Sequence, residues 1–291
     1  MKVYLAGEQF SGVEEIVHRR LFSYWYNRRK NKDYKAARAR GVDCFLDSGA
    51  YTAHTQGVDI SLDEFAAFIH ASKDVWTCIS NLDRTGKTEE ECARTYSNQK
   101  ALESLGCKVQ PVFHTREDPK WLVKYLDEGY DYIFLGGMVP ESTQWLKGWL
   151  DDLWANYLTN ADGTARVKVH GFGLTDQLLM FRYPWHSVDS TSWLFTGSFG
   201  GCMFWVDGRA RKIVFTPESP SSKKLDAPHY SNLPPVQQRV VDGWLERYGV
   251  TAAQCADHYS HRNKVNAVAF YEMEKHGAVT FKRTEQGLFD A

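Results

Sequence analysis

Short apolar runs recur along the first two thirds of the chain, and most of them end in Gly, Asp or His. Runs that are apolar on both faces are typical of strands in a parallel sheet that helices cover. We predict strands at Val3–Ala6, Cys44–Asp47, Thr77–Leu82, Lys108–His114, Tyr132–Gly136, Val167–Gly173 and Ser187–Asp189, with Cys202–Val206 as a candidate for the eighth.

Amphipathic segments separate these runs, and their spacing predicts helices. The helices are expected at Val13–Arg29, Leu62–Ser72, Thr88–Leu105, Pro119–Glu128 and Thr143–Tyr157. Strands that alternate with helices indicate an α/β fold, and about eight strands in roughly 200 residues favour a (β/α)8 TIM-like barrel over an open sheet. The last two connections are too short for full helices. No GxGxxG follows the first strand, which argues against a dinucleotide-binding sheet.

The pattern changes after Val206. Asp207-Gly208 joins Cys202–Val206 to Arg211–Phe215, as in a β-hairpin. A Pro- and Ser-rich loop is expected at Pro217–Pro235, and two helices at Val236–Tyr248 and Ala252–Lys275. We therefore predict one domain over residues 1–291. Its barrel core covers about residues 1–206, and a C-terminal hairpin, loop and helices cover about residues 207–291.

Composition restricts the class of protein. Apolar residues make up 43% of the 291 residues, which is enough to bury a core and excludes wholesale disorder. The net charge is −1, so any nucleic acid must be bound by a local patch. The six Cys are scattered without a CxxC and are interpreted as reduced thiols of a cytoplasmic protein. No apolar run reaches 18 residues, so no membrane span is expected.

Polar residues gather where the predicted strands end, and in a parallel barrel these ends meet at one mouth. The set consists of Asp47, Ser48, Asp83, His114, Gly136, Gly137, the run His170–Gly173 and Asp189. Each member has an ordinary structural explanation: Asp caps helices, Gly forms turns, and a buried His is often a core residue. The functional interpretation depends on the whole set. Two carboxylates across a pocket suit glycosidic chemistry, in which one attacks the anomeric carbon and the other moves protons.

The order of these motifs resembles that of the tRNA-guanine transglycosylases. The family's Asp-Ser-Gly-Gly-Phe/Tyr motif is similar to Asp47–Tyr51, which differs only at Ala50. Its Gly-Gly-Leu is similar to Gly136-Gly137-Met138. Its Gly-x-Gly strand end, followed by an essential Asp, is similar to Gly171-Phe172-Gly173 and Asp189. The resemblance covers roughly residues 44–193 and implies a barrel enzyme that exchanges guanine for a 7-deazaguanine base.

The resemblance also implies roles for single residues. Asp189 would be the nucleophile that forms a covalent glycosyl-enzyme intermediate, and Asp47 the general acid and base. Asp83 would accept hydrogen bonds from the purine, while Ser48, the Gly136-Gly137 pair and Gly171 would lie against the base. Tyr51 and His170 would sandwich its ring. His114 stands where the family usually has a base-binding Gln.

One departure from the family is large, because its Cys-x-Cys-x-x-Cys…His zinc site is absent. Cys255, His258 and His261 share one face of the expected C-terminal helix, but three ligands do not close a structural zinc site. We therefore expect no cofactor, with a minor zinc alternative at these three residues. A compact member without the zinc insertion resembles the bacteriophage branch that inserts 7-deazaguanines into DNA and so evades restriction; a phage protein would act in the host cytoplasm.

A DNA-directed enzyme needs cations and a way to reach the base. The expected helix Val13–Arg29 and its end supply Arg19, Arg20, Arg28, Arg29 and Lys30 among aromatic residues, and Arg209, Arg211 and Lys212 form a second cluster. Lys223 and Lys224 lie in the Pro- and Ser-rich loop. Cations neutralise phosphates and aromatic rings stack on displaced bases. The target guanosine must be flipped out or single-stranded, because a duplex hides the C1′–N9 bond.

Other functions remain open at this stage. They are a zinc-free tRNA-guanine transglycosylase, a non-catalytic partner subunit that positions nucleic acid, and an unrelated barrel glycoside hydrolase. A scaffold would need neither Asp47 nor Asp189, and a hydrolase would use water as the acceptor.

Overall fold

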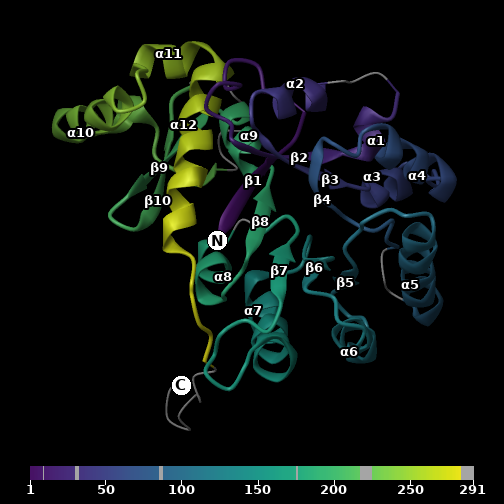
Figure 1. Ribbon diagram of the computed structural model, residues 1–291. Coiled ribbons are helices and arrows are strands. Elements are labelled where there is room, and N and C mark those ends of the chain that lie inside the picture. Colours follow the sequence, from purple (N-terminus) through teal and green to yellow (C-terminus); the bar gives the residue numbers. More distant parts are fainter. Residues whose placement is uncertain (9, 30–32, 85–87, 175, 217–224, 283–291) are drawn as a thin grey trace, which may run out of the picture.

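The computed structural model describes residues 1–8, 10–29, 33–84, 88–174, 176–216 and 225–282, and its centre is an eight-stranded sheet (Figure 1). The strands are β1 (Lys2–Ala6), β2 (Arg19–Ser23), β3 (Asp43–Asp47), β4 (Trp76–Ile79), β5 (Val112–His114), β6 (Tyr132–Gly136), β7 (Lys168–Gly171) and β8 (Ser187–Ser190). Their order is β4-β3-β2-β1-β8-β7-β6-β5, and neighbours are parallel. A parallel bridge between Ser80 and Gln110 links the two outermost strands. The predicted TIM-like α/β fold is therefore confirmed.

The prediction of one strand was wrong. Cys202–Val206 does not join the barrel. The remaining strand is instead Arg19–Ser23, which was expected within a helix and which pairs with β1 on one side and β3 on the other. Leu21 faces the barrel interior while Arg20 and Phe22 face outward, so the segment alternates as a strand does. Pairing on both sides outweighs the weak helical pattern of its residues, since local propensity yields to tertiary context.

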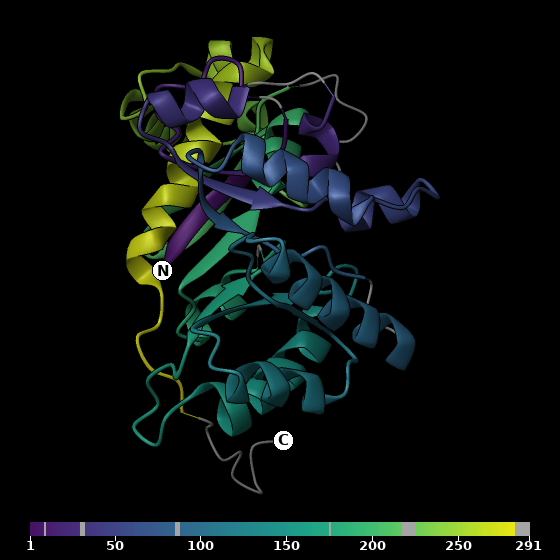
Figure 2. The same cartoon turned by 45° about the vertical axis from the view of Figure 1, so that its right-hand side comes forward.

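Helices cover the outside of the sheet (Figures 1 and 2). They are α1 (Tyr24–Asn27), α2 (Asp33–Ala39), α3 (Ala50–Thr55), α4 (Leu62–Ala71), α5 (Glu89–Ser104), α6 (Pro119–Asp127), α7 (Thr143–Leu153) with a π-helical turn at Trp154–Leu158, α8 (Gln177–Arg182) and α9 (Ser192–Ser198). Thr88 and Glu91 form the capping box that begins α5. The helices α8 and α9 have only 6 and 7 residues, as the short connections after β7 and β8 predicted.

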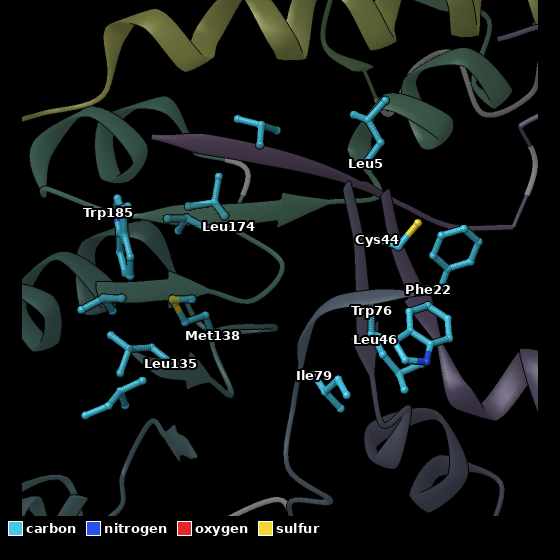
Figure 3. Packing of buried hydrophobic residues seen from close by; sticks show 14 of the residues in the cluster. Leu5, Phe22, Cys44, Leu46, Trp76, Ile79, Leu135, Met138, Leu174 and Trp185 are labelled. Carbon is cyan, nitrogen blue, oxygen red and sulfur yellow. The ribbon is translucent and has the colours of Figure 1, made fainter. Parts of the chain in front are cut away.

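Alternate residues of each strand belong to two different cores. Outward side chains pack under the helices; Figure 3 shows Leu5, Cys44 and Leu135 in this outer layer. Inward side chains, among them Tyr4, Phe45 and Phe134, fill the barrel interior. This alternation decides which strand residues face the interior.

The chain after β8 adds a separate elaboration. The expected hairpin is formed by β9 (Gly201–Val206) and β10 (Arg209–Val214), which pair antiparallel. It is followed by a 3-10 turn (Tyr230–Asn232), α10 (Pro235–Glu246), α11 (Ala252–Asp257), α12 (Tyr259–Met273) and a 3-10 turn (Glu274–His276). Its apolar residues, among them Phe204, Val241 and Cys255, form a second buried cluster. Residues 217–224 of the expected loop lie outside the described residues.

The helix α12 and the turn after it tie this elaboration to the first two strands (Figure 2). The Val3 backbone N–H donates to Glu274 Oε1 at 2.8 Å, and the Arg19 N–H donates to the Tyr271 hydroxyl at 3.2 Å. Arg19 also forms an ion pair with Glu274. Phe270 and Met273 pack into the outer core with Val3. Among the described residues, no helix combines the length and apolar character needed to cross a membrane.

Candidate active site

Most of the predicted strand-end residues lie together at the carboxyl-terminal mouth of the barrel. Asp47, His114 and Gly136 end β3, β5 and β6, and Asp189 lies one residue before the end of β8. The strand alternation turns Asp47 and Asp189 toward the interior, because they share a face with Phe45 and Ser187 of their own strands. The mouth therefore brings together carboxylates from opposite halves of the sequence.

The turn after β3 depends on a glycine. Gly49 has a φ of +72°, and a Cβ there would lie 2.5 Å from Trp25 Cβ. The Gly49 N–H donates to Asp47 Oδ2 at 2.9 Å, which fixes the carboxylate against its own backbone. Ala50 is the first residue of α3 and has a helical environment that accepts a methyl group. The departure at Ala50 is thus compatible with the turn.

Asp47 has the strongly altered acidity expected of a proton-transfer group. Burial raises its pKa to about 7, and repulsion from the Asp83 and Asp189 carboxylates adds to this rise. The hydrogen bond from Gly49 acts in the opposite direction. A carboxyl group with this pKa is close to half-protonated near neutral pH, so it can both donate and accept a proton.

A chain of hydrogen bonds holds Asp83. Its Oδ1 accepts from the Ser48 hydroxyl at 3.0 Å, and its Oδ2 lies 2.9 Å from His114 Nε2. His114 Nδ1 lies 2.8 Å from Glu117 Oε1. Glu117 is buried and was missed by the sequence analysis, where a carboxylate three residues after a strand-end His was the available signal.

His114 carries a positive charge between these two carboxylates. Burial opposes that charge, but the hydrogen bonds with Asp83 and Glu117 outweigh burial and raise the His114 pKa to about 10. Burial also raises the pKa of Glu117, and the imidazolium limits that rise. His114 therefore orients Asp83. Both of its ring nitrogens contact protein carboxylates, Asp83 and Glu117, and not a bound base.

The glycine pair after β6 makes room for these side chains. A Cβ on Gly136 would lie 2.7 Å from His114 Cδ2, and one on Gly137 would lie 2.7 Å from Thr115 Oγ1. Gly137 also has a φ of +72°, and its carbonyl accepts from the Thr115 hydroxyl at 2.8 Å. Any side chain at either position would displace the neighbours that line the mouth.

Asp189 is buried, and one of its oxygens is held in place. Asp189 Oδ1 accepts from the Gly173 N–H at 2.9 Å and lies 3.3 Å from His170 Nε2. Gly173 has a φ of +63°, which turns its N–H toward the carboxylate. The hydrogen bond uses Oδ1; no bond to Oδ2 is found within the part of the chain that the structure describes.

The expected sandwich of Tyr51 and His170 is not formed in this structure. Tyr51 is 64% exposed at the start of α3, whereas His170 is completely buried. The His170 ring lies among Phe45, Phe134 and Phe172, so it offers no free face to a ligand. The strand pleat explains this position. His170 and Lys168 are two residues apart on β7 and lie on its interior face, so the imidazole points into the barrel interior and not into the mouth. A Cβ at Gly171 would lie 3.2 Å from the Trp185 ring in the outer layer.

Two of the predicted phosphate-binding cations are elsewhere in the fold. The Arg20 guanidinium is buried, stacks on Phe10 and Phe22, and donates to Asp33 at 2.5 Å. Arg19 lies at the start of β2, at the end of the barrel opposite the mouth. Both interpretations were wrong because this segment is a strand and not a surface helix.

The remaining cations have different positions. Arg28 follows α1 on the side of the mouth and stacks on Trp25, and Arg29 comes next along the chain. Arg209 and Arg211 lie on the exposed face of β10. Lys30, Lys223 and Lys224 lie outside the described residues.

A cleft of about 490 Å³ lies beside the mouth. Its walls include Met138, Gly173, Gln177 and Lys212, so the hairpin contributes a cation to the ends of β6 and β7. The Ala210 N–H donates to Gln177 Oε1 at 3.2 Å, which fixes the hairpin against α8.

Exposed apolar side chains surround the same mouth. They stand in the first turns or loops that follow five different strands: Tyr26, Tyr51, Val139, Leu178 and Phe195. Each is at least 50% exposed. Rings and aliphatic side chains in this position are suited to contact flat or unstacked ligand groups.

The minor zinc alternative is not supported by the helix geometry it assumed. The expected helix is interrupted at His258, which caps α12 through its contact with Ser260, so Cys255 and His261 lie on different helices. Cys255 points into the second core, with its sulfur 3.6 Å from that of Cys202. Across the described ranges, no group of three Cys, His, Asp or Glu side chains is placed to hold a metal ion.

Comparison with known proteins adds little to this geometry. No protein-family model and no curated protein matches the chain. A solved structure described as a putative fructose-1,6-biphosphate aldolase from Coccidioides immitis matches over 93% of this chain and 89% of its own, with 9% identity and a TM-score of 0.43. Neither finding bears on the chemistry of the mouth.

Proposed function

We propose that the protein is a pentosyltransferase that replaces guanine in DNA with a 7-deazaguanine derivative through a covalent glycosyl-aspartate intermediate. The observation that carries the proposal is a pair of carboxylates in unlike surroundings at one mouth. Asp47 has a pKa raised to about 7, and Asp189 has one oxygen held by the Gly173 N–H. This division of roles suits a proton-transfer group and a nucleophile.

The two half-reactions balance without an external oxidant or metal. In the first, a carboxylate oxygen of Asp189 attacks C1′, the C1′–N9 bond breaks, and the departing guanine takes a proton from Asp47. In the second, Asp47 takes a proton from N9 of the incoming base, N9 attacks C1′, and the C1′–O bond to Asp189 breaks. Asp47 needs to be protonated in one step and ionised in the other, which a pKa of about 7 allows.

The base is expected to lie against Asp83. Both oxygens of Asp83 accept one hydrogen bond from the protein, and each retains a second lone pair for a purine N1–H and amino group. The His114 imidazolium fixes the carboxylate in this orientation. A guanine and a 7-deazaguanine present the same donors on this edge, so one site serves both leaving and incoming bases.

The rim supports a nucleic acid as the source of the guanosine. Tyr26, Tyr51 and Phe195 supply stacking faces for displaced bases, and Arg28 and Lys212 supply cations near the mouth. Flipping a base costs a few kcal/mol of stacking and pairing, which such contacts offset. Protection of phage DNA from restriction is the biological role that this chemistry would serve.

Labelled-guanine exchange tests the proposal. The purified protein is incubated with radiolabelled guanine and either duplex DNA, single-stranded DNA or tRNA. We expect label in DNA, and incorporation into tRNA alone would favour the zinc-free tRNA enzyme. Release of free guanine with water as acceptor would indicate a hydrolase, and no reaction with any polymer would favour the partner-subunit alternative.

A second experiment examines the covalent intermediate. An oligonucleotide with a labelled 5′ end is mixed with the protein, the departed guanine is removed, and the mixture is separated under denaturing conditions. We expect an adduct with the wild type and none with Asp189→Ala. Asp47→Asn should lower exchange by about 10²- to 10⁴-fold, the usual loss when a general acid-base group is removed.

A further inference from the structure

Three polar side chains form a chain through the mostly apolar interior of the barrel. The Tyr132 hydroxyl lies 2.5 Å from Ser187 Oγ, and Ser187 Oγ lies 2.6 Å from His170 Nδ1. The three residues come from β6, β8 and β7, and all face the interior. The chain runs from the opposite end of the barrel, where Tyr132 borders a cavity of about 280 Å³, toward Asp189 at the mouth.

Because the surroundings are apolar, the position of each proton in this chain affects the free energy of the fold. His170 and Ser187 are fully buried, and Phe45, Phe134 and Phe172 surround the imidazole. A buried donor without an acceptor costs free energy, so each proton here needs a partner. In the part of the chain that the structure describes, Ser187 is the partner of both the Tyr132 hydroxyl and His170 Nδ1.

The far side of the imidazole faces the carboxylate. His170 Nε2 lies 3.3 Å from Asp189 Oδ1, off the line of an ordinary hydrogen bond, and has no other partner among the described residues. A lone pair on Nε2 would face a negatively charged oxygen and be repelled. A proton on Nε2 would instead be attracted, and a small rotation of either group would complete the bond.

The Tyr132 end of the chain favours the same arrangement. Burial raises the pKa of the Tyr132 phenol far above its usual value, so this hydroxyl keeps its proton and donates to Ser187. Ser187 has a single proton, and its remaining neighbour in the chain is His170 Nδ1. Nδ1 then accepts, and the imidazole proton must be on Nε2. Burial lowers the pKa of His170, which keeps the ring neutral.

We propose that Tyr132 and Ser187 are positioning residues that hold His170 in the tautomer with its proton on Nε2. His170 and the Gly173 N–H then both hold Asp189 Oδ1, which leaves Oδ2 as the oxygen that attacks C1′. The kinetic part of this proposal rests on the proposed function. The tautomer itself does not, so the two are tested separately.

Nitrogen-15 NMR of histidine-labelled protein measures the tautomer directly. The signal of His170 is assigned by its loss in His170→Gln. We expect a protonated Nε2 and a bare, hydrogen-bonded Nδ1 at pH 7.5. A protonated Nδ1, or an imidazolium, would overturn the proposal whatever reaction the protein catalyses.

Two variants show which group sets the tautomer. In Asp189→Ala the carboxylate is gone, and we expect the proton to stay on Nε2 because Tyr132 still donates along the chain. In Asp189→Ala combined with Tyr132→Phe, Ser187 is free to accept from Nδ1, and we expect both tautomers. The Nε2 tautomer persisting unchanged in the double variant would show that Tyr132 does not direct the chain.

Kinetics tests the consequence for Asp189. Tyr132→Phe and Ser187→Ala should each lower kcat of base exchange by about 10- to 100-fold, with little change in KM for the base, because they misplace a reacting oxygen and spare the base site. Tyr125→Phe and Ser72→Ala, which remove buried hydroxyls elsewhere, serve as matched controls and should retain the wild-type kcat. A rise in KM with kcat unchanged would contradict the positioning role. Absent exchange activity together with the expected tautomer would count against the proposed function alone.

Discussion

The two ends of the barrel treat their carboxylates differently. At the end where the strands begin, Asp43 is bonded to Lys2 and Tyr4 and lies near Arg19, and Asp131 pairs with Lys168. At the mouth, neither Asp47 nor Asp189 has a Lys or Arg partner among the described residues. Strand β3 has an acidic residue at each of its ends, Asp43 and Asp47, but within the described ranges only Asp43 lies against Lys and Arg side chains.

This difference separates carboxylates that stabilise the fold from carboxylates that can take part in a reaction. An ion pair lowers the energy of a carboxylate and keeps it ionised, so paired groups are inert in proton transfer. An unpaired carboxylate near others is costly, and a fold retains it where its altered acidity is useful. The contrast thus indicates the mouth as the reactive end, in agreement with the usual placement of sites in such barrels.

The largest difference between the two ends is expected when one carboxylate is removed from each. Asp189→Asn should lower base exchange by at least about 10³-fold, because an amide does not form the covalent intermediate. Asp43→Asn, the matched variant at the opposite end, should keep the rate within about twofold. Steady-state guanine exchange measures both. Equal losses would show that the two ends are not functionally distinct.

Removing the His114 imidazolium from the mouth should have the next largest effect, which is on the free energy of unfolding. His114→Ala leaves Asp83 and the buried Glu117 without their partner and should lower the free energy of unfolding by about 3–5 kcal/mol. The His114 pKa is raised above its unfolded value of about 6.5, so its contribution is complete below that pH and is lost as the pH rises toward 10. Urea unfolding at pH 6, 8 and 10 should therefore show a narrowing gap between wild type and variant. A gap that widens with pH would contradict the charged state of His114.

Asp47→Asn should stabilise the fold, the opposite of the effect expected for His114→Ala. The folded-state pKa of about 7 exceeds the unfolded value of about 3.9, so ionised Asp47 destabilises the fold increasingly from pH 4 to pH 7. The variant should therefore melt a few degrees above the wild type at pH 8 and show no gain at pH 4. Calorimetry measures this, with the exposed Asp127→Asn as control. An unchanged Tm difference across this range would mean that Asp47 has ordinary acidity.

The smallest effect is expected for an exposed pair at the opposite end. Asp131 and Lys168 are 3.2 Å apart, and their side chains are 79% and 51% exposed. Asp131→Asn should change the free energy of unfolding by no more than about 1 kcal/mol and leave exchange unaffected. A loss as large as that of His114→Ala would end the distinction between the two regions. Denaturant titration at low and high salt provides the measurement.

The sequence predicted most of the barrel because buried parallel strands are continuously apolar. It failed at Arg19–Ser23, where Arg20 points into the outer core and obscures the pattern by stacking on Phe10 and Phe22. The eighth strand was then assigned to Cys202–Val206, an equally apolar run that pairs in a hairpin. The apolar pattern alone does not distinguish a strand that pairs within the barrel from one that pairs in a hairpin.

The site was predicted in part for a similar reason. Strand ends are readable from sequence, so the position of Asp47, Asp83, His114 and Asp189 at the mouth was predicted. Glu117 was missed because its role depends on the angle at which a turn returns to His114. Tyr132 and Ser187 were missed because their contact joins strands far apart in sequence, and strand register is set only in the folded sheet.

The bond between Val3 and Glu274 constrains the order in which the chain folds. The two residues are 271 positions apart, and Phe270 and Met273 cover the outward side chains of β1. During synthesis β1 leaves the ribosome first, but α12, which packs over it, is the last helix to be made. The central strand of the sheet therefore waits, with apolar side chains accessible, until nearly the whole described chain has emerged. Contacts of such long range slow folding and lengthen exposure to aggregation, so chaperone demand should depend on α12 more than on any helix between the strands.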